Sequence, residues 1–149
     1  MAANRQKKDL IGPAELKIDL SRGADPQVFK WLVACELFGR RISQDIAARA
    51  FTELDDAGLL TPRKLADADW QRLVDLLGAG GDKRYDESTA SELLELGQDV
   101  LDTYDGKLSR MAEGIDTRKA LKDRVQEFKG IGPTAAQIFV REVSEPWGI

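Results

Sequence analysis

The sequence contains no histidine, and this absence removes several kinds of active site. Without an imidazole there is no histidine general base, no Ser-His or Cys-His nucleophile pair, and no histidine-ligated zinc. Cys35 is the single cysteine, so one chain cannot form a disulfide, a zinc cluster or an iron-sulfur cluster. Because Cys35 lies in an apolar run, we expect it to be a core residue of a cytoplasmic protein.

Long apolar runs and strand patterns are also missing. No stretch approaches the length of a membrane span, and Met1 to Asp9 is polar and basic, unlike a secretory leader. We therefore expect a soluble, cytoplasmic chain with no membrane partner. β-Branched alternation is absent, which predicts no sheet. Apolar residues make up 42% of the 149 residues, enough for the core of one domain, and the net charge of −4 argues against a generally basic coat for nucleic acid.

Apolar residues at helical spacing, separated by caps, glycines and prolines, predict an all-α fold of about eight helices. Asp25 is expected to cap the first helix, Pro26 to take its first position and Gly39 to end it. The other helices are expected at 43–57, from 61 onward, and at 69–77, 87–104, 107–112, 117–128 and 133–143. Residues 1–24 lack steady periodicity and predict an N-terminal tail on a helical domain at 25–149. Four residues are expected to hold this tail to the body: Leu10, Ile11, Leu16 and Ile18.

The most informative segment joins the last two predicted helices: Phe128-Lys129-Gly130-Ile131-Gly132-Pro133-Thr134-Ala135-Ala136. Gly130 can take the left-handed conformation that ends a helix, and Pro133 suits the first turn of the next one. Gly132 lets the backbone approach a ligand closely. The amides of Gly132, Thr134 and Ala135 would then point outward at a helix N-terminus, which favours a phosphate oxygen. Ile131 is the expected apolar contact that holds the turn down.

The same pattern also suits a plain αα-hairpin with a glycine stop and a proline start. Charge favours the phosphate site. Residues 107–141 contain eight Lys or Arg and four Asp or Glu, a net charge of +4, which leaves −8 for the rest of the chain. Such a local concentration of positive charge is typical of a nucleic-acid contact surface, and binding through it should be salt-sensitive.

Two further loops carry cations. Gly39-Arg40-Arg41 lies between the first two predicted helices, where the paired guanidinium groups could grip a phosphate or complement the end of a helix. Gly78 to Asp86 places Lys83-Arg84-Tyr85 before a long helix, with Asp86 as its expected cap. These residues could supply two cations and a stacking aromatic ring, or form a solvated loop with the ring packed inward.

From Pro26 to Val143 the chain resembles the helix-hairpin-helix DNA glycosylase superfamily, which contains endonuclease III, adenine glycosylase and the alkyladenine and 8-oxoguanine glycosylases. Phe128 to Ala136 is similar to the family hairpin: apolar residue, x, Gly, apolar, Gly, x, x, x, Ala. Arg84 to Ala90 reads Arg-Tyr-Asp-x-Ser-Thr-Ala and is most similar to compact members that lack an iron-sulfur cluster. The resemblance implies an orthogonal helical bundle with the hairpin motif at 117–143.

This resemblance also implies base excision repair. The hairpin would hold a phosphate of duplex DNA, and loop carbonyls, here those of Lys129 and Ile131, would bind a monovalent cation. The upstream loops would wedge into the duplex while a damaged base is flipped out. No other cofactor is expected, and we expect a monomer. The DNA-contacting residues implied in this way are Lys129, Gly130, Ile131, Gly132, Thr134, Ala135, Arg40, Arg41, Lys83, Arg84 and Tyr85.

The catalytic residues of the family are not matched. In bifunctional members a lysine two residues after the second hairpin glycine attacks the sugar, and here Thr134 holds that position. Threonine cannot form a Schiff base, so AP-lyase activity is not expected. The resemblance places the essential aspartate of the family just past Ile149. Asp86 is the one candidate general base for a monofunctional glycosylase, and the alternative is a non-catalytic helical module that binds DNA structure or a protein partner.

Overall fold

The computed structural model describes residues 11–40, 42–78 and 83–149, and for residues 83–85 the backbone alone. These residues form helices and no strand, which confirms the predicted all-α class. The described part of the chain has seven α-helices, and the expected helix at 107–112 is a short 3-10 helix instead. The elements are η2 Pro13–Leu16, α1 Asp25–Phe38, α2 Gln44–Asp56, α3 Pro62–Ala66, α4 Trp70–Leu77, α5 Lys83–Tyr104, η4 Leu108–Ala112, α6 Arg118–Val125 and α7 Pro133–Val143.

Four helices begin where the sequence places a capping side chain. Ser43, Thr61, Asp69 and Thr117 precede α2, α3, α4 and α6, and each side chain accepts a hydrogen bond from a backbone N–H three residues on, at 3.0–3.1 Å. Such a bond satisfies one of the amides that the first helical turn leaves without a partner. The starts of these helices are therefore determined locally.

Two predicted caps are wrong. α1 begins with Asp25 itself, and Ala24 holds its cap position without a side-chain bond. The Asp25 carboxylate instead accepts hydrogen bonds from the backbone N–H of Ser109 at 2.7 Å and from its hydroxyl at 3.3 Å. α5 begins at Lys83, so Asp86 lies in its first turn rather than at its cap. A tertiary contact explains the first difference, and a longer helix explains the second.

α6 ends at Val125, three residues before the predicted end. The next amides change partner: the N–H groups of Glu127 and Phe128 bond to carbonyls three residues back, on Arg124 and Val125, at 3.1 and 3.3 Å. Such tighter bonds are common at helix ends. They turn the chain toward the hairpin earlier than the apolar pattern indicates.

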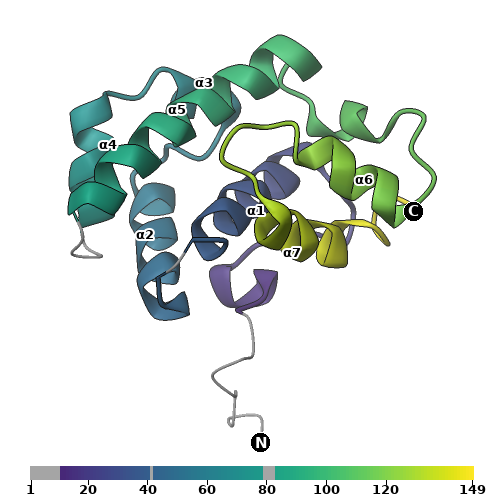
Figure 1. The fold of residues 1–149 in the computed structure, drawn as a ribbon, viewed down its shortest axis with the longest axis horizontal. Helices are drawn as coiled ribbons and strands as arrows, with labels where there is room; N and C mark the ends of the chain where they lie inside the picture. Colours follow the sequence, from purple (N-terminus) through teal and green to yellow (C-terminus); the bar gives the residue numbers. More distant parts are fainter. Residues whose placement is uncertain (1–10, 41, 79–82) are drawn as a thin grey trace, which may run out of the picture.

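α1 lies at the centre of the fold (Figure 1), in contact with α2 on one side and α7 on the other. α3 and α4 pack on α5, while α6 packs on α7. Every residue of α1 from Trp31 to Phe38 is buried, Glu36 included. A helix that is surrounded in this way needs apolar residues on all sides rather than along one stripe. The sequence of α1 has this composition.

The segment before α1 packs on the helical body. Its buried residues are Ile11, Leu16, Ile18 and Leu20. The first three were expected there, and Leu10 lies outside the described residues. Trp147 closes over the same region: its indole N–H donates to the Gly23 carbonyl at 3.0 Å, and its ring packs edge-on against Phe139 with centroids 6.1 Å apart. The segment before α1 is thus joined to the C-terminal part of the described chain by the contact between Gly23 and Trp147.

Cys35 is fully buried in α1, which confirms its predicted place in the core. Burial raises the pKa of its thiol well above the ordinary value. None of the described helices has the length and apolar character needed to cross a membrane. Over the same residues, no three acidic or cysteine side chains come together as a group that could hold a metal ion.

Candidate nucleic-acid interface

The turn between α6 and α7 has the backbone that its glycines predict. Gly130 has a φ of +92°, in the left-handed region that favours glycine. Ile131 is only 4% exposed, so it holds the turn against the core as expected. Gly132 occupies the cap position of α7, and Pro133 is the first residue of the helix. The buried Ile131 therefore anchors the turn, while Gly132, Pro133 and Thr134 are exposed to solvent.

α7 begins without a side-chain cap, although the fold would permit one. Gly132 has φ −91° and ψ −172°, an extended conformation open to any residue, and a Cβ built there would meet nothing within 4 Å. Ser, Thr, Asn or Asp usually occupies such a position and bonds the first amides of the helix. With glycine, the N–H groups of Gly132 and Thr134 have no side-chain cap, and both residues are exposed.

Ala135 does not share this exposure. It is 2% exposed, and a Cβ on Gly39 would lie 2.9 Å from its Cβ and 3.2 Å from its backbone nitrogen. The missing side chain at Gly39 therefore lets the end of α1 close on the first turn of α7. Ala135 packs against Gly39 and is not open to a ligand, which argues against the phosphate contact predicted for it.

Two carboxylates lie directly behind the turn. A Cβ on Gly130 would lie 3.0 Å from Glu92 Oε1, on α5, and 3.2 Å from Glu36 Oε2, on α1. Arg40 forms ion pairs with both carboxylates, and its Nη2 lies 3.5 Å from Glu36 Oε2. Burial raises the pKa of Glu36 to about 7, and the nearby Arg40 charge opposes that rise. The positive φ favours glycine here, and a Cβ would also crowd the two carboxylates.

The Arg40 ion pairs change the predicted role of the Gly39-Arg40-Arg41 loop. The structure brings Gly39 and Arg40 to the hairpin, as expected, but the Arg40 guanidinium is engaged by Glu36 and Glu92. It supports the turn from beneath rather than facing a ligand. Arg41 lies outside the described residues, as do the side chains of Lys83-Arg84-Tyr85, so their DNA contacts stay predictions.

Lys129 remains at the surface beside the turn. Its Nζ lies 3.5 Å from Glu95 Oε1, and its side chain is 69% exposed. Exposed ion pairs of this kind contribute little, so the ammonium group can exchange this partner for a phosphate. The backbone carbonyls of Lys129 and Ile131 take part in no backbone hydrogen bond within the described residues. Their part in binding a monovalent cation stays a prediction.

Asp86 is 3% exposed, and one of its carboxylate oxygens lies 3.7 Å from the position of a Cβ on Gly78, at the end of α4. A general base must reach the proton that it removes, directly or through one water molecule. The burial of Asp86 therefore argues against the catalytic role considered for it.

A basic hollow of about 270 Å³ lies between α6 and α7. Four of its lining residues are cationic and none is acidic. The full lining is Arg118, Lys119, Lys122, Gln137, Val140 and Arg141. The excess positive charge of residues 107–141 was visible in the sequence, but this arrangement was not, because it depends on how α6 packs on α7.

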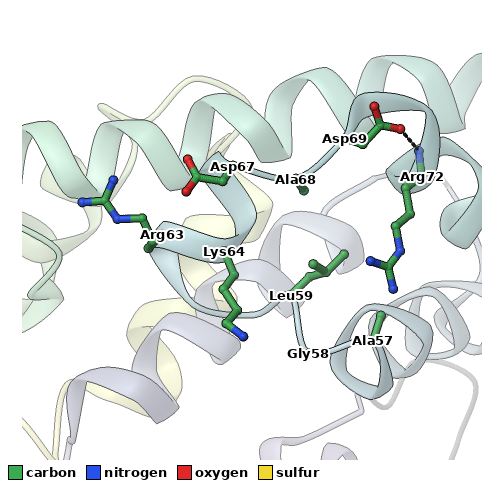
Figure 2. Close-up of a pocket in the computed structure, with 9 residues that line it drawn as sticks. All are labelled: Ala57, Gly58, Leu59, Arg63, Lys64, Asp67, Ala68, Asp69 and Arg72. Carbon is green, nitrogen blue, oxygen red and sulfur yellow. Dashed lines mark hydrogen bonds between the residues drawn. The ribbon is translucent and has the colours of Figure 1, made fainter.

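A second hollow, of about 420 Å³, lies where α2, α3 and α4 meet (Figure 2). Its charge is mixed, with three cations and two carboxylates. Figure 2 shows Lys64 and Arg72 extending on either side of Leu59, while Asp69 turns away and accepts a hydrogen bond from the Arg72 N–H. The full lining is Ala57, Gly58, Leu59, Arg63, Lys64, Asp67, Ala68, Asp69 and Arg72.

Sequence reasoning missed the two carboxylates behind the turn. Glu36 had a local signal, because it is the one charged residue between Trp31 and Phe38 and Arg40 follows four positions later. Glu92 had none, since it reaches the turn from a separate helix.

No family model matches the chain, no curated protein matches it, and no solved structure matches its fold. The resemblance to helix-hairpin-helix glycosylases therefore stays a prediction. The function has to be inferred from the site itself.

Proposed function

We propose that this protein binds duplex DNA through the turn between α6 and α7, with a phosphate oxygen held by the N–H groups of Gly132 and Thr134. The uncapped start of α7 carries this proposal: Gly132 and Thr134 are exposed there, and the extended backbone of Gly132 does not require a glycine. Two outward amides and the positive end of a helix dipole suit an anion. Lys129 stands beside them with a largely exposed side chain.

In this proposal the turn is the hairpin of a base excision repair protein of the glycosylase type, acting as a monomer in the cytoplasm. The left-handed Gly130 and the buried Ile131 support it, since both hold the turn in one conformation. Residues 107–141, with their net charge of +4, would attract the DNA. Thr134 cannot supply an amine nucleophile, so the proposed role is DNA recognition, and base excision is a separate test.

Fluorescence anisotropy with a labelled duplex, repeated at several salt concentrations, tests the binding. We expect log Kd to change with log salt by about 0.9 for each phosphate contacted, over a few contacts. Gly132→Glu places a carboxylate before the amides and should weaken binding by about tenfold or more, equivalent to about 1.4 kcal/mol. The neutral variant Gly132→Gln should lose much less. Salt-independent binding, or equal losses in the two variants, would contradict the proposed site.

Base excision can be measured on duplexes that carry different damaged bases, with and without alkali to reveal abasic sites. We expect no strand cleavage without alkali, because Thr134 cannot act as a lyase nucleophile. Asp86→Asn should leave any excision unchanged, because Asp86 is buried. A loss of excision in that variant, with folding intact, would restore Asp86 as the general base.

A further inference from the structure

The hollow between α6 and α7 gathers cations that the hairpin turn does not use. Lys119 and Arg141 each have a carboxylate neighbour at the surface, at 2.8 and 2.9 Å. Arg118 and Lys122 have none within 4 Å in the part of the chain that the structure describes. No carboxylate lines the hollow itself. Two of the four cations that line the hollow are therefore left without a carboxylate partner in the described residues.

The stability of α6 does not explain the cation at Arg118. Arg118 directly follows the cap residue Thr117, and the first turn of α6 contains no acidic residue. The helix dipole opposes a cation at Arg118, whereas Lys122 lies in the last turn, where the dipole favours it. The like charges of Arg118 and Lys122, four residues apart, also repel each other. Sequences that break local rules in this way usually do so at functional sites.

The hollow and the hairpin turn share one face of α7. Gln137 and Arg141 follow Thr134 at three and seven positions, which places all three on one side of a helix, and all three are exposed. At about 1.5 Å per residue, Arg141 lies about 10 Å beyond Thr134 along α7. This separation corresponds to about three nucleotides of one DNA strand, at about 3.4 Å of helix axis each.

We infer that the hollow between α6 and α7 binds a second phosphate group of the same DNA strand, held by Arg118, Lys122 and Arg141 with Gln137 as an additional hydrogen-bond donor. This inference rests on the proposed function. Four cations, two of them without a carboxylate partner in the described residues, match the phosphodiester backbone, a polyanion, better than an isolated small anion. The hollow beside α3 lacks this excess, because two carboxylates offset its three cations.

The double variant Arg118→Gln/Lys122→Gln tests the inference, with Arg63→Gln/Lys64→Gln on α3 as a control that removes the same two charges. Duplex binding is measured over a range of salt concentrations. We expect the α6 variant to bind about tenfold more weakly at low salt and its log–log salt slope to fall by about 0.9, the value for one phosphate contact. The α3 variant should keep the slope of the unmodified protein.

Thermal unfolding separates lost binding from lost folding, and the α6 variant should unfold at the same temperature or a higher one, because two repelling charges are removed. Equal losses in the α6 and α3 variants would overturn the inference in favour of general attraction. Normal binding by the α6 variant, together with weak binding by Gly132→Glu, would overturn the inference and leave the proposed function standing. If the unmodified protein bound no duplex DNA, both would fall.

Discussion

Replacing Gly132 with aspartate should make the protein more stable and its DNA binding weaker. Gly132 holds the cap position of α7 in an extended conformation, with open space where a side chain would project. An aspartate there can accept a hydrogen bond from the N–H of Thr134, because a cap side chain bonds the second or third amide of a helix. Its carboxylate would then occupy the place proposed for the phosphate oxygen.

The expected gain in stability has three sources. An aspartate cap is better than glycine by a few tenths of a kcal/mol. Its charge near the positive end of the helix dipole contributes about 0.3–1 kcal/mol. Removing glycine, which lowers the freedom of the unfolded chain, contributes about 0.4–1 kcal/mol at a compatible position. The sum of about 1–2 kcal/mol would raise the Tm of a domain of this size by about 2–8 °C.

Thermal unfolding followed by circular dichroism measures the stability, and duplex anisotropy at fixed salt measures the binding. Gly132→Asn is the matched control, because asparagine caps a helix about as well as aspartate but carries no charge. It should bind DNA better than Gly132→Asp and should gain less stability. A stabilised Gly132→Asp variant that binds DNA as tightly as the unmodified protein would refute the phosphate site. A destabilised variant would show that the fold does need this glycine.

Three further predictions concern the core and the support of the turn. Burial raises the pKa of Glu36 from 4.5 to about 7, so its contribution to stability is complete below pH 4.5 and is lost as the pH rises through 7. Between pH 4 and pH 8 the unmodified protein should therefore lose about 3 kcal/mol more than Glu36→Gln in urea titrations, and parallel pH profiles would contradict this. Thr89→Val should raise the free energy of unfolding by about 1 kcal/mol, because the buried Thr89 hydroxyl has no hydrogen-bond partner in the described residues. Unchanged or lower stability of Thr89→Val in urea would refute that reasoning. Gly97→Ala should cost about 1–3 kcal/mol, because the new Cβ would lie 2.8 Å from the Ala66 nitrogen and 2.9 Å from the Pro62 carbonyl oxygen. An unchanged Tm would mean that α5 does not cross α3 so closely.

The sequence by itself determined the starts of α2, α3, α4 and α6 and the backbone of the turn, because both depend on residues close together along the chain. Ser43, Thr61 and Thr117 cap helices through bonds to amides three residues away. Gly130 and Pro133 restrict their own backbone angles, so the turn could be predicted without knowing what packs against it. The burial of Ile131 followed from its apolar side chain in that turn.

Only the tertiary structure decided which charged groups meet. A helical pattern identifies the face of a helix that is buried, but the neighbours of that face depend on how helices cross. Arg40 was therefore expected at DNA, yet Glu92 reaches it from α5, in addition to its near neighbour Glu36 on α1. Ala135 was expected to be open, yet the end of α1 covers it at Gly39. The basic hollow exists for the same reason, because its cations come from both α6 and α7.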